Sequence, residues 1–553
     1  MKKIFLFATT AFLIAVGSCK KLELPPTFEL ASSEINKSTS NLDGLINGAY
    51  GRWIAQGAGN LQFASGFDHI LFAEAMASGR TTFPSPQSSA AAVTNLAYNF
   101  SLLEDNAALG RLSRNLYASI AMANSVLYYA QYDPPQDADF PIQKGRLLGE
   151  AYFIRALCFF QAVRYWGHQY GHNSNAAGGG IMLALDISRD GTVGVGRSSV
   201  EDAYRRILND LDSATLLLPA NYDPVQHAAY PAYRFRASKA AAIALQAKVN
   251  FQQATPASYQ KAKELINRVL GPTPGAIAST PETGGRTFAL QTDVKVPFNA
   301  VGFQAPPANS EEILRLVNNT SATQGYTTAS QNLTSESGGN PFNRGQARWF
   351  LARPTPNPPA GSPVNTSPLF DDPLNDRRFT ELTANFSFTG GVGNQRFSQK
   401  WGLQTQQTLI GMQSLPLLRA ADLVIMRAEI NAVQGNLADA LADYNLIRRR
   451  AITGYADRTL AHPAIGGTQA GLIAEIVQER RRELLFEGDE FWSWKRMAAY
   501  NAQNGPVYPA AEVAPLIRGT QTFAWNANRI LLKIALDDLT LNPQLGTGAQ
   551  NPG

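Results

Sequence analysis

Two histidines stand at a spacing that could serve metal chemistry. His168 and His172 are four positions apart, as metal-binding histidines are on one face of a helix. Gly167 and Gly171 argue against a continuous helix here, and the sequence places no carboxylate or third histidine nearby. We therefore expect both histidines to lie in a loop, and we predict no metal site and no cofactor.

A glycine-rich stretch nearly matches a phosphate-binding loop. Residues 191–198 read Gly-Thr-Val-Gly-Val-Gly-Arg-Ser and precede an expected helix. Arg197 stands where such a loop needs a lysine, and a planar guanidinium does not replace a compact ammonium at the terminal phosphates. We interpret the stretch as a flexible loop that leads into a capped helix.

Catalytic signatures are absent from the sequence. There is no Gly-x-Ser-x-Gly elbow and no His-Glu-x-x-His pair, and the chain has only five histidines. Asp and Glu total 43, which is too many for one pair to be nominated as a glycosidase acid and base. We expect a protein that is not an enzyme. A surface glycoside hydrolase, with two carboxylates facing one cleft, is the enzymatic alternative.

Cys19 is the residue that says most about location. A Met-Lys-Lys start precedes an apolar run over residues 4–16, and Gly17 and Ser18 come directly before the cysteine. Residues 1–18 have the proportions of a secretory signal peptide and are too short to span a membrane. The small-small-Cys ending is typical of a bacterial lipobox, so we expect an exported Gram-negative protein whose N-terminal cysteine is acylated. An ordinary signal peptide followed by a chance cysteine is the alternative.

The composition excludes several classes of protein. A formal charge of +5, spread along 553 residues, is too weak to indicate a nucleic-acid partner. Charged residues make up only 16%, and such a surface suits neutral polar ligands better than ionic ones. Cys158 is the only other cysteine, so no disulfide framework is expected, and its apolar neighbours predict a core position.

Apolar periodicity predicts helices through much of the chain. Two pairs look like repeats, because each joins two helices by a tight turn within about 34 residues and places alanines where the helices approach. That period is typical of tetratricopeptide repeats, which bury their faces by stacking. The first pair covers 237–253 and the helix after Pro256, and the second covers 417–434 and 437–447. Single helices are expected near 41–53, 116–132, 149–166 and 198–218, the last with a capping box.

The segment 271–412 has a different character, rich in Pro, Gly, Asn, Thr and Ser, with one short run at 312–317 that suits a strand. Its aromatic residues argue against disorder, so we expect a functional region.

The charged run 479–483 lies on an amphipathic pattern and predicts a helix that docks through paired charges. Trp492 and Trp494, on the next helix, are assigned to the core.

Several segments together resemble the SusD/RagB family of outer-membrane nutrient-binding lipoproteins. The most specific is residues 479–496, Glu-Arg-Arg-Arg-Glu-Leu-Leu-Phe-Glu-Gly-Asp-Glu-Phe-Trp-Ser-Trp-Lys-Arg. The others are 150–167, 197–219, 309–313, 375–379, 415–419, and the tail motifs 541–543 and 550–553. One departure follows the first helix, where the family often has an acidic Ser-Asp pair and this chain reads Ala75-Met-Ala-Ser-Gly79.

The resemblance implies a mainly α-helical, tetratricopeptide-like body of about four helix pairs, with a loop-rich C-terminal region containing a few short strands. It implies a lipid-anchored linker at 19–40, an N-terminal helical domain at 41–270, a ligand-region insert at 271–412 and a C-terminal region at 413–553. It also implies a SusC-like TonB-dependent β-barrel partner and an outer-membrane, outward-facing location. The ligand would be an oligosaccharide or, in some branches, a peptide.

The candidate ligand residues follow from the chemistry of sugars. Sugars present apolar C–H faces and hydroxyl rims, so a site needs flat aromatic rings beside polar side chains. The candidates are Arg80, Phe83, Tyr326, Trp349 and Trp401. For each of them, burial as an ordinary core residue is the alternative. A scaffold lipoprotein, whose repeats bind a partner protein without any small ligand, remains a further alternative.

Overall fold

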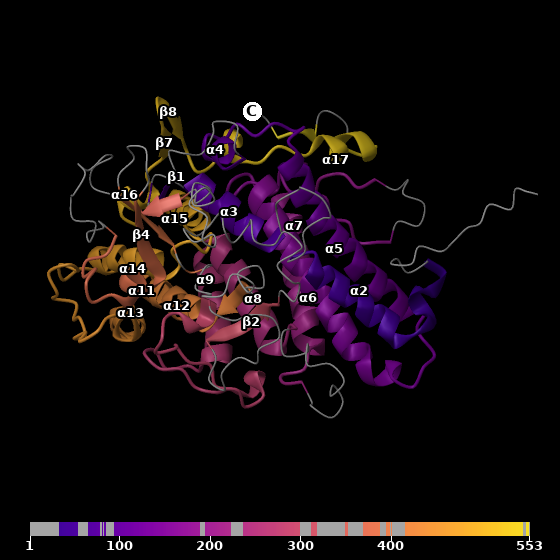
Figure 1. Cartoon of the computed structure of the whole chain (residues 1–553), viewed down its shortest axis with the longest axis horizontal. Helices are drawn as coiled ribbons and strands as arrows, with labels where there is room; N and C mark the ends of the chain where they lie inside the picture. The colour runs from indigo at the N-terminus through magenta and orange to yellow at the C-terminus, as the bar shows by residue number, and fades with distance from the viewer. Residues whose placement is uncertain are drawn as a thin grey trace, which may run out of the picture.

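Long helices make up most of the described chain and pack side by side (Figure 1). The computed structural model describes residues 32–53, 65–77, 80, 82–84, 93–187, 194–222, 236–298, 311–317, 349–351, 369–387, 394–398, 400, 415–545 and 549–551. Each helix from α5 to α9 contacts the next along the chain, and α12 continues the row beside α9. The N-terminal helices are α2 (Thr39–Gly51), α3 (Ser65–Ala77), α4 (Val93–Tyr98), α5 (Ala107–Tyr132), α6 (Phe140–Trp166), α7 (Val200–Leu217), α8 (Lys239–Gln253) and α9 (Pro256–Leu270).

The C-terminal half completes this helical row. α12 packs against α13 and α14, and α15 packs against α3, so the two halves of the chain share one core. The predicted mainly α-helical class is confirmed. No helix in the described ranges is both long and apolar enough to span a bilayer. The helices are α11 (Arg377–Leu382), α12 (Ala420–Val433), α13 (Leu437–Ala451), α14 (Gln469–Glu483), α15 (Glu490–Asn504), α16 (Ala510–Val513) and α17 (Leu536–Leu541).

The two predicted helix pairs are present. Ala254, with a φ of 60°, turns the chain after α8, and the Thr255 hydroxyl accepts a hydrogen bond from the Ser258 amide at the start of α9. Residues 434–436 join α12 to α13, and Gly435 has a φ of 82° there. Alanines fill α8 and are buried, which lets the neighbouring helices approach closely.

The starts of two predicted helices differ from expectation. α5 and α6 begin well before Leu116 and Gly149, where the apolar periodicity first becomes strong. Asn106 begins α5 by accepting a hydrogen bond from the Ala108 amide, and the buried Leu109 and Leu112 show that the apolar face already starts in the first turns of the helix. The capped start of α7 is as predicted, because the Ser199 hydroxyl accepts from the Asp202 amide.

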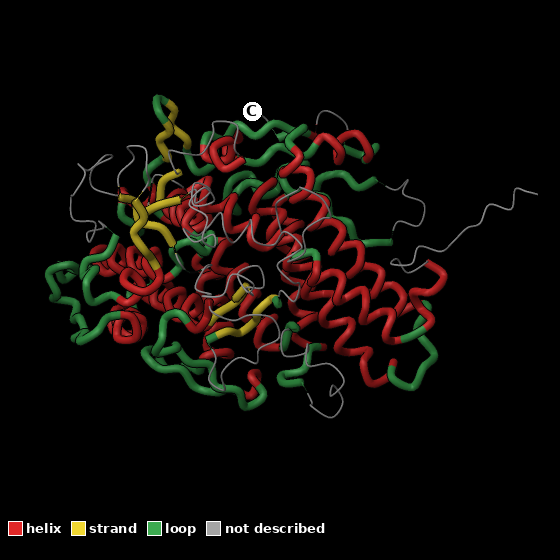
Figure 2. Tube along the Cα trace, in the orientation of Figure 1, coloured by secondary structure: helices red, strands yellow, loops and turns green. Residues whose placement is uncertain are grey.

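The described strands are short and pair antiparallel in twos. The run predicted at 312–317 forms β2 (Glu312–Leu316), which pairs with β6 (Leu415–Arg419). Figure 2 shows the strands in separate small groups, while helices fill the remainder of the body. The other pairs are β1 (Thr82–Pro84) with β3 (Trp349–Leu351), β4 (Thr383–Ser387) with β5 (Asn394–Ser398), and β7 (Leu516–Arg518) with β8 (Gln521–Phe523).

The predicted core positions of one cysteine and two tryptophans are confirmed. Cys158 in α6 is fully buried, and burial raises the pKa of its thiol to about 12. Trp492 and Trp494 in α15 are buried as well, and the Trp494 indole N–H donates to the Ala514 carbonyl at 2.9 Å. These side chains therefore serve packing.

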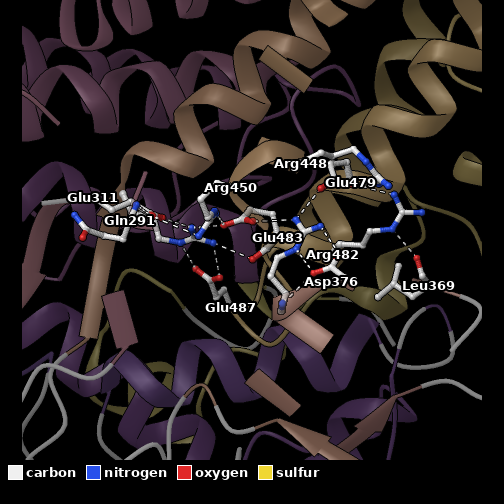
Figure 3. Close-up of polar contacts among 12 residues, drawn as sticks. Gln291, Glu311, Leu369, Asp376, Arg448, Arg450, Glu479, Arg482, Glu483 and Glu487 are labelled. Carbon is white, nitrogen blue, oxygen red and sulfur yellow. Dashed lines mark hydrogen bonds and ion pairs between the residues drawn. The ribbon is translucent and has the colours of Figure 1, made fainter. Parts of the chain in front are cut away.

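The charged run 479–483 lies in α14 and is largely buried, as expected of a helix that docks through paired charges (Figure 3). Glu479 contacts Arg378 at 2.7 Å, Arg448 at 2.8 Å and Arg482 at 2.9 Å. Burial alone would raise the pKa of Glu479, but these three guanidinium groups lower it to about 2. Glu479 thus joins α14 to α11 and α13.

The second acidic residue of the run extends this network toward the β2–β6 pair. Glu483 contacts Arg419 of β6 at 2.7 Å and Arg378 at 3.0 Å. Arg419 also reaches Glu311 at 2.6 Å and Glu487 at 2.7 Å (Figure 3). One cluster of charges therefore joins the segment 271–412, through Glu311 and Arg378, to α14 and β6.

The N-terminal end of the described chain lies against the turn between α5 and α6. A 3-10 helix, η1 (Ser32–Lys37), falls within the segment predicted as a linker at 19–40. The Asn36 amide donates to Asp133 at 2.8 Å, and the Thr39 hydroxyl donates to Asp137 at 2.5 Å. The end of that predicted linker is therefore held on the helical body.

Candidate ligand-binding site

Two strands that are distant in sequence come together at the candidate site. In the β1–β3 ladder, Phe83 stands opposite Phe350 and Pro84 stands opposite Trp349. Two of the five candidate residues, Phe83 and Trp349, thus occupy adjoining steps of one ladder. β3 also contacts β5, and β1 also contacts α3 and α4.

An alternating charge cluster lies at the base of β1, and we call Arg80, Arg481, Glu490 and Glu512 the platform cluster. The Arg80 Nε lies 2.5 Å from the Glu490 Oε1, and an Arg80 Nη2 hydrogen bond reaches the Glu512 carbonyl at 2.9 Å. Arg481 bridges the same two carboxylates, at 2.9 Å from Glu490 and 2.6 Å from Glu512. The cluster therefore ties the chain entering β1 to α14, α15 and α16.

Each member of the platform cluster is largely buried. Burial alone would raise the pKa of Glu490, but Arg481 and Arg80 hold it below its usual value. Arg481 has a raised pKa, since Glu490 and Glu512 together outweigh the burial that would lower it. Buried charges that are paired in this way resist separation, because an unpaired one would be strongly disfavoured.

The helix before β1 is also docked on the signature region. Gly488 has a φ of 76°, and its amide donates to the Glu74 carboxyl of α3 at 2.8 Å. A Cβ at position 488 would lie 3.1 Å from the Ile70 Cα, so only glycine fits without a shift. Burial raises the pKa of Glu74 to about 8, although the Gly488 amide opposes this.

The five candidate residues are placed as follows. Phe83 and Trp349 lie on the paired strands, and Arg80 comes two residues before β1 with a side chain that is only 12% exposed. Tyr326, Trp401 and the predicted anchor Cys19 lie outside the described residues. The ligand-contact role stays a prediction for all five candidates, and the observed partners of Arg80 are carboxylates of the protein itself.

Sequence reasoning missed the rest of the platform cluster. Arg481 was interpreted only as a helix-docking charge, and Glu490 and Glu512 were not singled out. The signal for Arg481 and Glu490 was present, because both lie in the signature run 479–496. No local pattern, however, connects Glu512 to Arg80, since their pairing depends on how α16 returns to α15.

The histidine pair lies in a loop, as expected. The rings of His168 and His172 are 4.8 Å apart between centroids, and His172 also meets Trp525 edge-on. Burial lowers the pKa of His168 to about 4, with Lys495 adding to the effect. Among the described residues, no group of three metal-ligating side chains is positioned to hold an ion.

The described end of the glycine-rich stretch has a structural role. Arg197 donates to the carbonyl groups of Trp166, Gly180 and Ala549, each at 2.9 Å. It thereby joins the end of α6 to the C-terminal tail. The interpretation as a loop leading into a capped helix is confirmed for residues 194–199.

Two described carboxyl groups have pKa values raised by burial to near neutrality, but they lie in different parts of the fold. Glu74 is in α3, where the pKa is about 8, and Glu312 is on β2, where the pKa is about 7. Glu312 is held by Arg315 at 3.2 Å, and neither carboxyl lines a described cavity. They do not form the facing pair that a glycosidase requires.

Two family models match the chain on either side of its middle. One, described as the SusD family, matches residues 380–553, and another, described as starch-binding associating with outer membrane, matches residues 73–251. Together they include the platform cluster and β1. The chain belongs to the SusD/RagB family.

Solved structures agree with this membership at the level of fold. A SusD superfamily protein from Bacteroides thetaiotaomicron is similar over 93% of this chain and 99% of its own, with 17% identity and a TM-score of 0.68. A putative sugar binding protein from Bacteroides vulgatus is similar over 93% and 98%, with 19% identity and a TM-score of 0.66.

A third similar structure is surface glycan-binding protein A from Bacteroides uniformis, which covers 93% of this chain and 98% of its own at 16% identity, with a TM-score of 0.64. No curated protein matches the chain.

The family models leave the middle of this SusD/RagB protein unmatched. β1 falls within the first matched region, whereas β3, with Trp349 and Phe350, falls between the two. The candidate site therefore pairs one strand from a family-matched segment with one from a segment that neither model matches.

Proposed function

We propose that this protein is a surface lipoprotein that binds nutrient oligosaccharides and delivers them to a SusC-like TonB-dependent outer-membrane transporter. Family membership supports the proposal, since one matching model is described as starch-binding associating with outer membrane. A similar fold also occurs in a protein named for surface glycan binding. The acyl group on Cys19 would hold the protein on the outer face of the membrane.

The single observation that carries the glycan proposal is the β1–β3 pairing. It brings Phe83, Trp349 and Phe350 to adjoining ladder positions on the platform cluster. Aromatic residues suit the apolar C–H faces of sugar rings, and successive positions of a strand alternate between the two faces of a ladder, so Phe83 and Phe350 share one face and Trp349 belongs to the other. A rigid base limits the entropy lost when the ligand binds, because the strands are already held in place.

A calorimetric titration with defined oligosaccharides tests ligand binding. The panel includes maltoheptaose, a fructan oligomer and a mixed peptide digest, so a peptide-binding member of the family would be recognised by its response. We expect micromolar or weaker affinity for one glycan class. Phe83→Ala and Trp349→Ala should each weaken it by roughly tenfold or more. Tyr132→Ala, which removes a 73% exposed ring on α5, is the control.

The same samples test the enzymatic alternative. Incubation with polysaccharide followed by analysis of released sugars should show no product if the protein only binds. Release of shorter sugars by the wild type would support a surface hydrolase and contradict the binding proposal.

Delivery is tested by co-purification from detergent-extracted membranes. We expect a TonB-dependent β-barrel protein to accompany the tagged chain. Recovery of the chain alone, with any TonB-dependent barrel left in other fractions, would remove the support for a transport partner. Recovery of the barrel without glycan binding would favour the scaffold alternative.

A further inference from the structure

Arg164 in α6 is a half-buried cation whose Nε is enclosed, and no described carboxylate lies within ion-pair distance of it. Its guanidinium lies over two rings, 4.5 Å from the Phe160 centroid and 5.0 Å from the Trp492 centroid. Its only described side-chain hydrogen bond goes to the Gln161 carbonyl oxygen, and its Nε has no partner. Burial lowers the pKa of Arg164, although nearby tyrosines and carboxylates oppose the effect.

Arg164 differs in this respect from many buried arginines of the same protein. Those arginines each contact a carboxylate at 2.7–2.8 Å, because a buried charge without a counter-ion is strongly disfavoured. They include Arg155 with Asp210, Arg378 with Asp376, Arg427 with Asp443, Arg448 with Glu479 and Arg496 with Glu429.

A second cation reinforces the positive charge near Arg164. Lys495 of α15 is buried, and its ammonium lies 5.6 Å from the Trp492 ring centroid. No ion pair of Lys495 is found among the described residues. Burial, with Arg164 adding to the effect, lowers the pKa of Lys495 to about 7. Two cations thus lie near the ring of one tryptophan, and no described carboxylate forms an ion pair with either of them.

Arg164 lines a cavity of about 100 Å³ together with Gln161, His69, Trp53, Tyr165 and Trp492. Such a volume accommodates a few water molecules or one small polar group. His69 is stacked between Trp53, at 5.0 Å, and Tyr165, at 5.4 Å. It is 95% buried, and neither of its ring nitrogens has a hydrogen-bond partner among the described residues. The cavity wall therefore holds unpaired polar groups besides Arg164.

Three carboxylates line other parts of this cavity, and each is already paired. Asp422 contacts Lys248 at 2.5 Å and Arg480 at 3.0 Å. Asp489 contacts Arg480 at 2.6 Å, and it also accepts a hydrogen bond from Ser493.

The third carboxylate, Glu487, contacts both Arg419 and Lys400 at 2.7 Å. Because these acids are held by other cations, Arg164 has no direct counter-ion in the part of the chain that the structure describes.

We propose that this cavity binds a small oxyanion, a carboxylate, sulfate or phosphate group, as the counter-ion of Arg164. The guanidinium donates charge-assisted hydrogen bonds to it, and the Gln161 amide NH₂, which has no described acceptor, is a second donor. The oxyanion is either a free ion or the acidic group of a sugar such as a uronate. The site is separate from the β1–β3 ladder and does not depend on the proposed glycan binding.

Thermal unfolding at constant ionic strength tests this site in the full mature chain. Chloride is replaced stepwise by sulfate, phosphate or sodium glucuronate, and intrinsic tryptophan fluorescence is followed alongside, since Trp53 and Trp492 line the cavity. We expect a saturable rise in Tm of the wild type at millimolar anion. Because sulfate stabilises proteins in general, the comparison between variants decides the result.

Two variants probe the proposed contact from opposite sides. Arg164→Gln removes the cation, and the apparent affinity for the anion should fall roughly tenfold or more. Gln161→Glu keeps Arg164 and supplies a carboxylate beside it, so this variant should unfold at a higher Tm and lose the anion response. Arg205→Gln, at a 64% exposed arginine on α7, is the control and should respond like the wild type.

The outcomes are distinguishable. A response to glucuronate alone assigns the site to acidic sugars, and a response to sulfate or phosphate assigns it to a free ion. An equal response in the wild type, Arg164→Gln and Gln161→Glu would overturn the proposal, as would no saturable response in the wild type. If Arg164→Gln does not fold, Gln161→Glu decides. Failure here leaves the glycan titrations unaffected, since they report on the β1–β3 site.

Discussion

The Arg80 Nε and the Glu490 Oε1 lie 2.5 Å apart, which joins the segment entering β1 to the first turn of α15. The contact spans more than four hundred positions of sequence and is enclosed by Arg481 and Glu512. It fixes the base of a ladder whose two strands carry Phe83 and Trp349. The charge network of the signature region therefore extends to the candidate ligand site.

Replacing Arg80 by methionine should reduce both stability and ligand affinity. Glu490 would keep only Arg481, and breaking a buried pair costs on the order of 3 kcal/mol in the free energy of unfolding. Chemical denaturation and glycan titration of Arg80→Met measure the two effects. Arg114→Met, which breaks an exposed pair with Asp537, should change stability by less than about 1 kcal/mol. Lost affinity at unchanged stability would instead indicate that Arg80 contacts the ligand directly.

Gly488→Ala should destabilise the protein more than Gly505→Ala. Both glycines have positive φ, 76° and 86°, so both variants acquire backbone strain of order 1 kcal/mol. A Cβ at 488 additionally lies 3.1 Å from the Ile70 Cα, whereas position 505 is open. The difference between the unfolding free energies of the two variants therefore measures how tightly α3 packs against the turn at Gly488. Equal effects would show that α3 adjusts freely.

Glu74→Gln should remove part of the pH dependence of stability. Burial raises the pKa of Glu74 from 4.5 to about 8, so between these values the folded state holds a proton that the unfolded state releases. This contribution is complete below pH 4.5 and declines as the pH rises toward 8, by at most about 1.4 kcal/mol per pH unit. Denaturation of wild type and Glu74→Gln from pH 5 to about pH 8 checks this sign. Parallel curves would contradict it.

Glu479→Gln should weaken the ion-pair network around α14. It should also reduce the loss of protein stability at low pH. The pKa of Glu479 is about 2 in the folded state, so its stabilisation is present above 4.5 and is lost as the pH falls toward 2. At neutral pH the variant should lose on the order of 3–5 kcal/mol, because three arginines lose their shared carboxylate. Asp457→Asn, which breaks the exposed pair with Arg449, is the matched control and should cost less than about 1 kcal/mol.

Cys19→Ser should release the protein from membranes. The prediction rests on the apolar run and the small residues before the cysteine, since acylation needs its thiol. Fractionation should place the wild type with outer membranes and the variant in soluble fractions. Mass spectrometry of the wild-type N-terminus should show acyl chains on Cys19. Membrane retention of the variant would point to another anchor.

Much of the helical body was predictable from the sequence, because its helices carry strong local signals. Ser199 predicts the start of α7, and the alanines of 237–253 predict a helix that neighbouring helices can approach closely. The starts of α5 and α6 were predicted too late, although Leu109 and Leu112 of α5 and Phe140 of α6 are buried apolar residues that an earlier start includes. Family membership was also recognisable, because residues 479–496 lie together in the chain.

The candidate site depended on tertiary structure. Aromatic content suggested Phe83 and Trp349 separately, but only strand pairing brought their positions together. Arg80 was predicted as a ligand contact, and folding supplied it with two carboxylate partners from α15 and α16. Likewise, no sequence pattern distinguishes Arg164 from the paired arginines. The local sequence determines where helices form and which face of each is apolar, because both depend on residues three or four positions apart. The counter-ion of a buried charge can come from any part of the chain, so only the tertiary structure decides it.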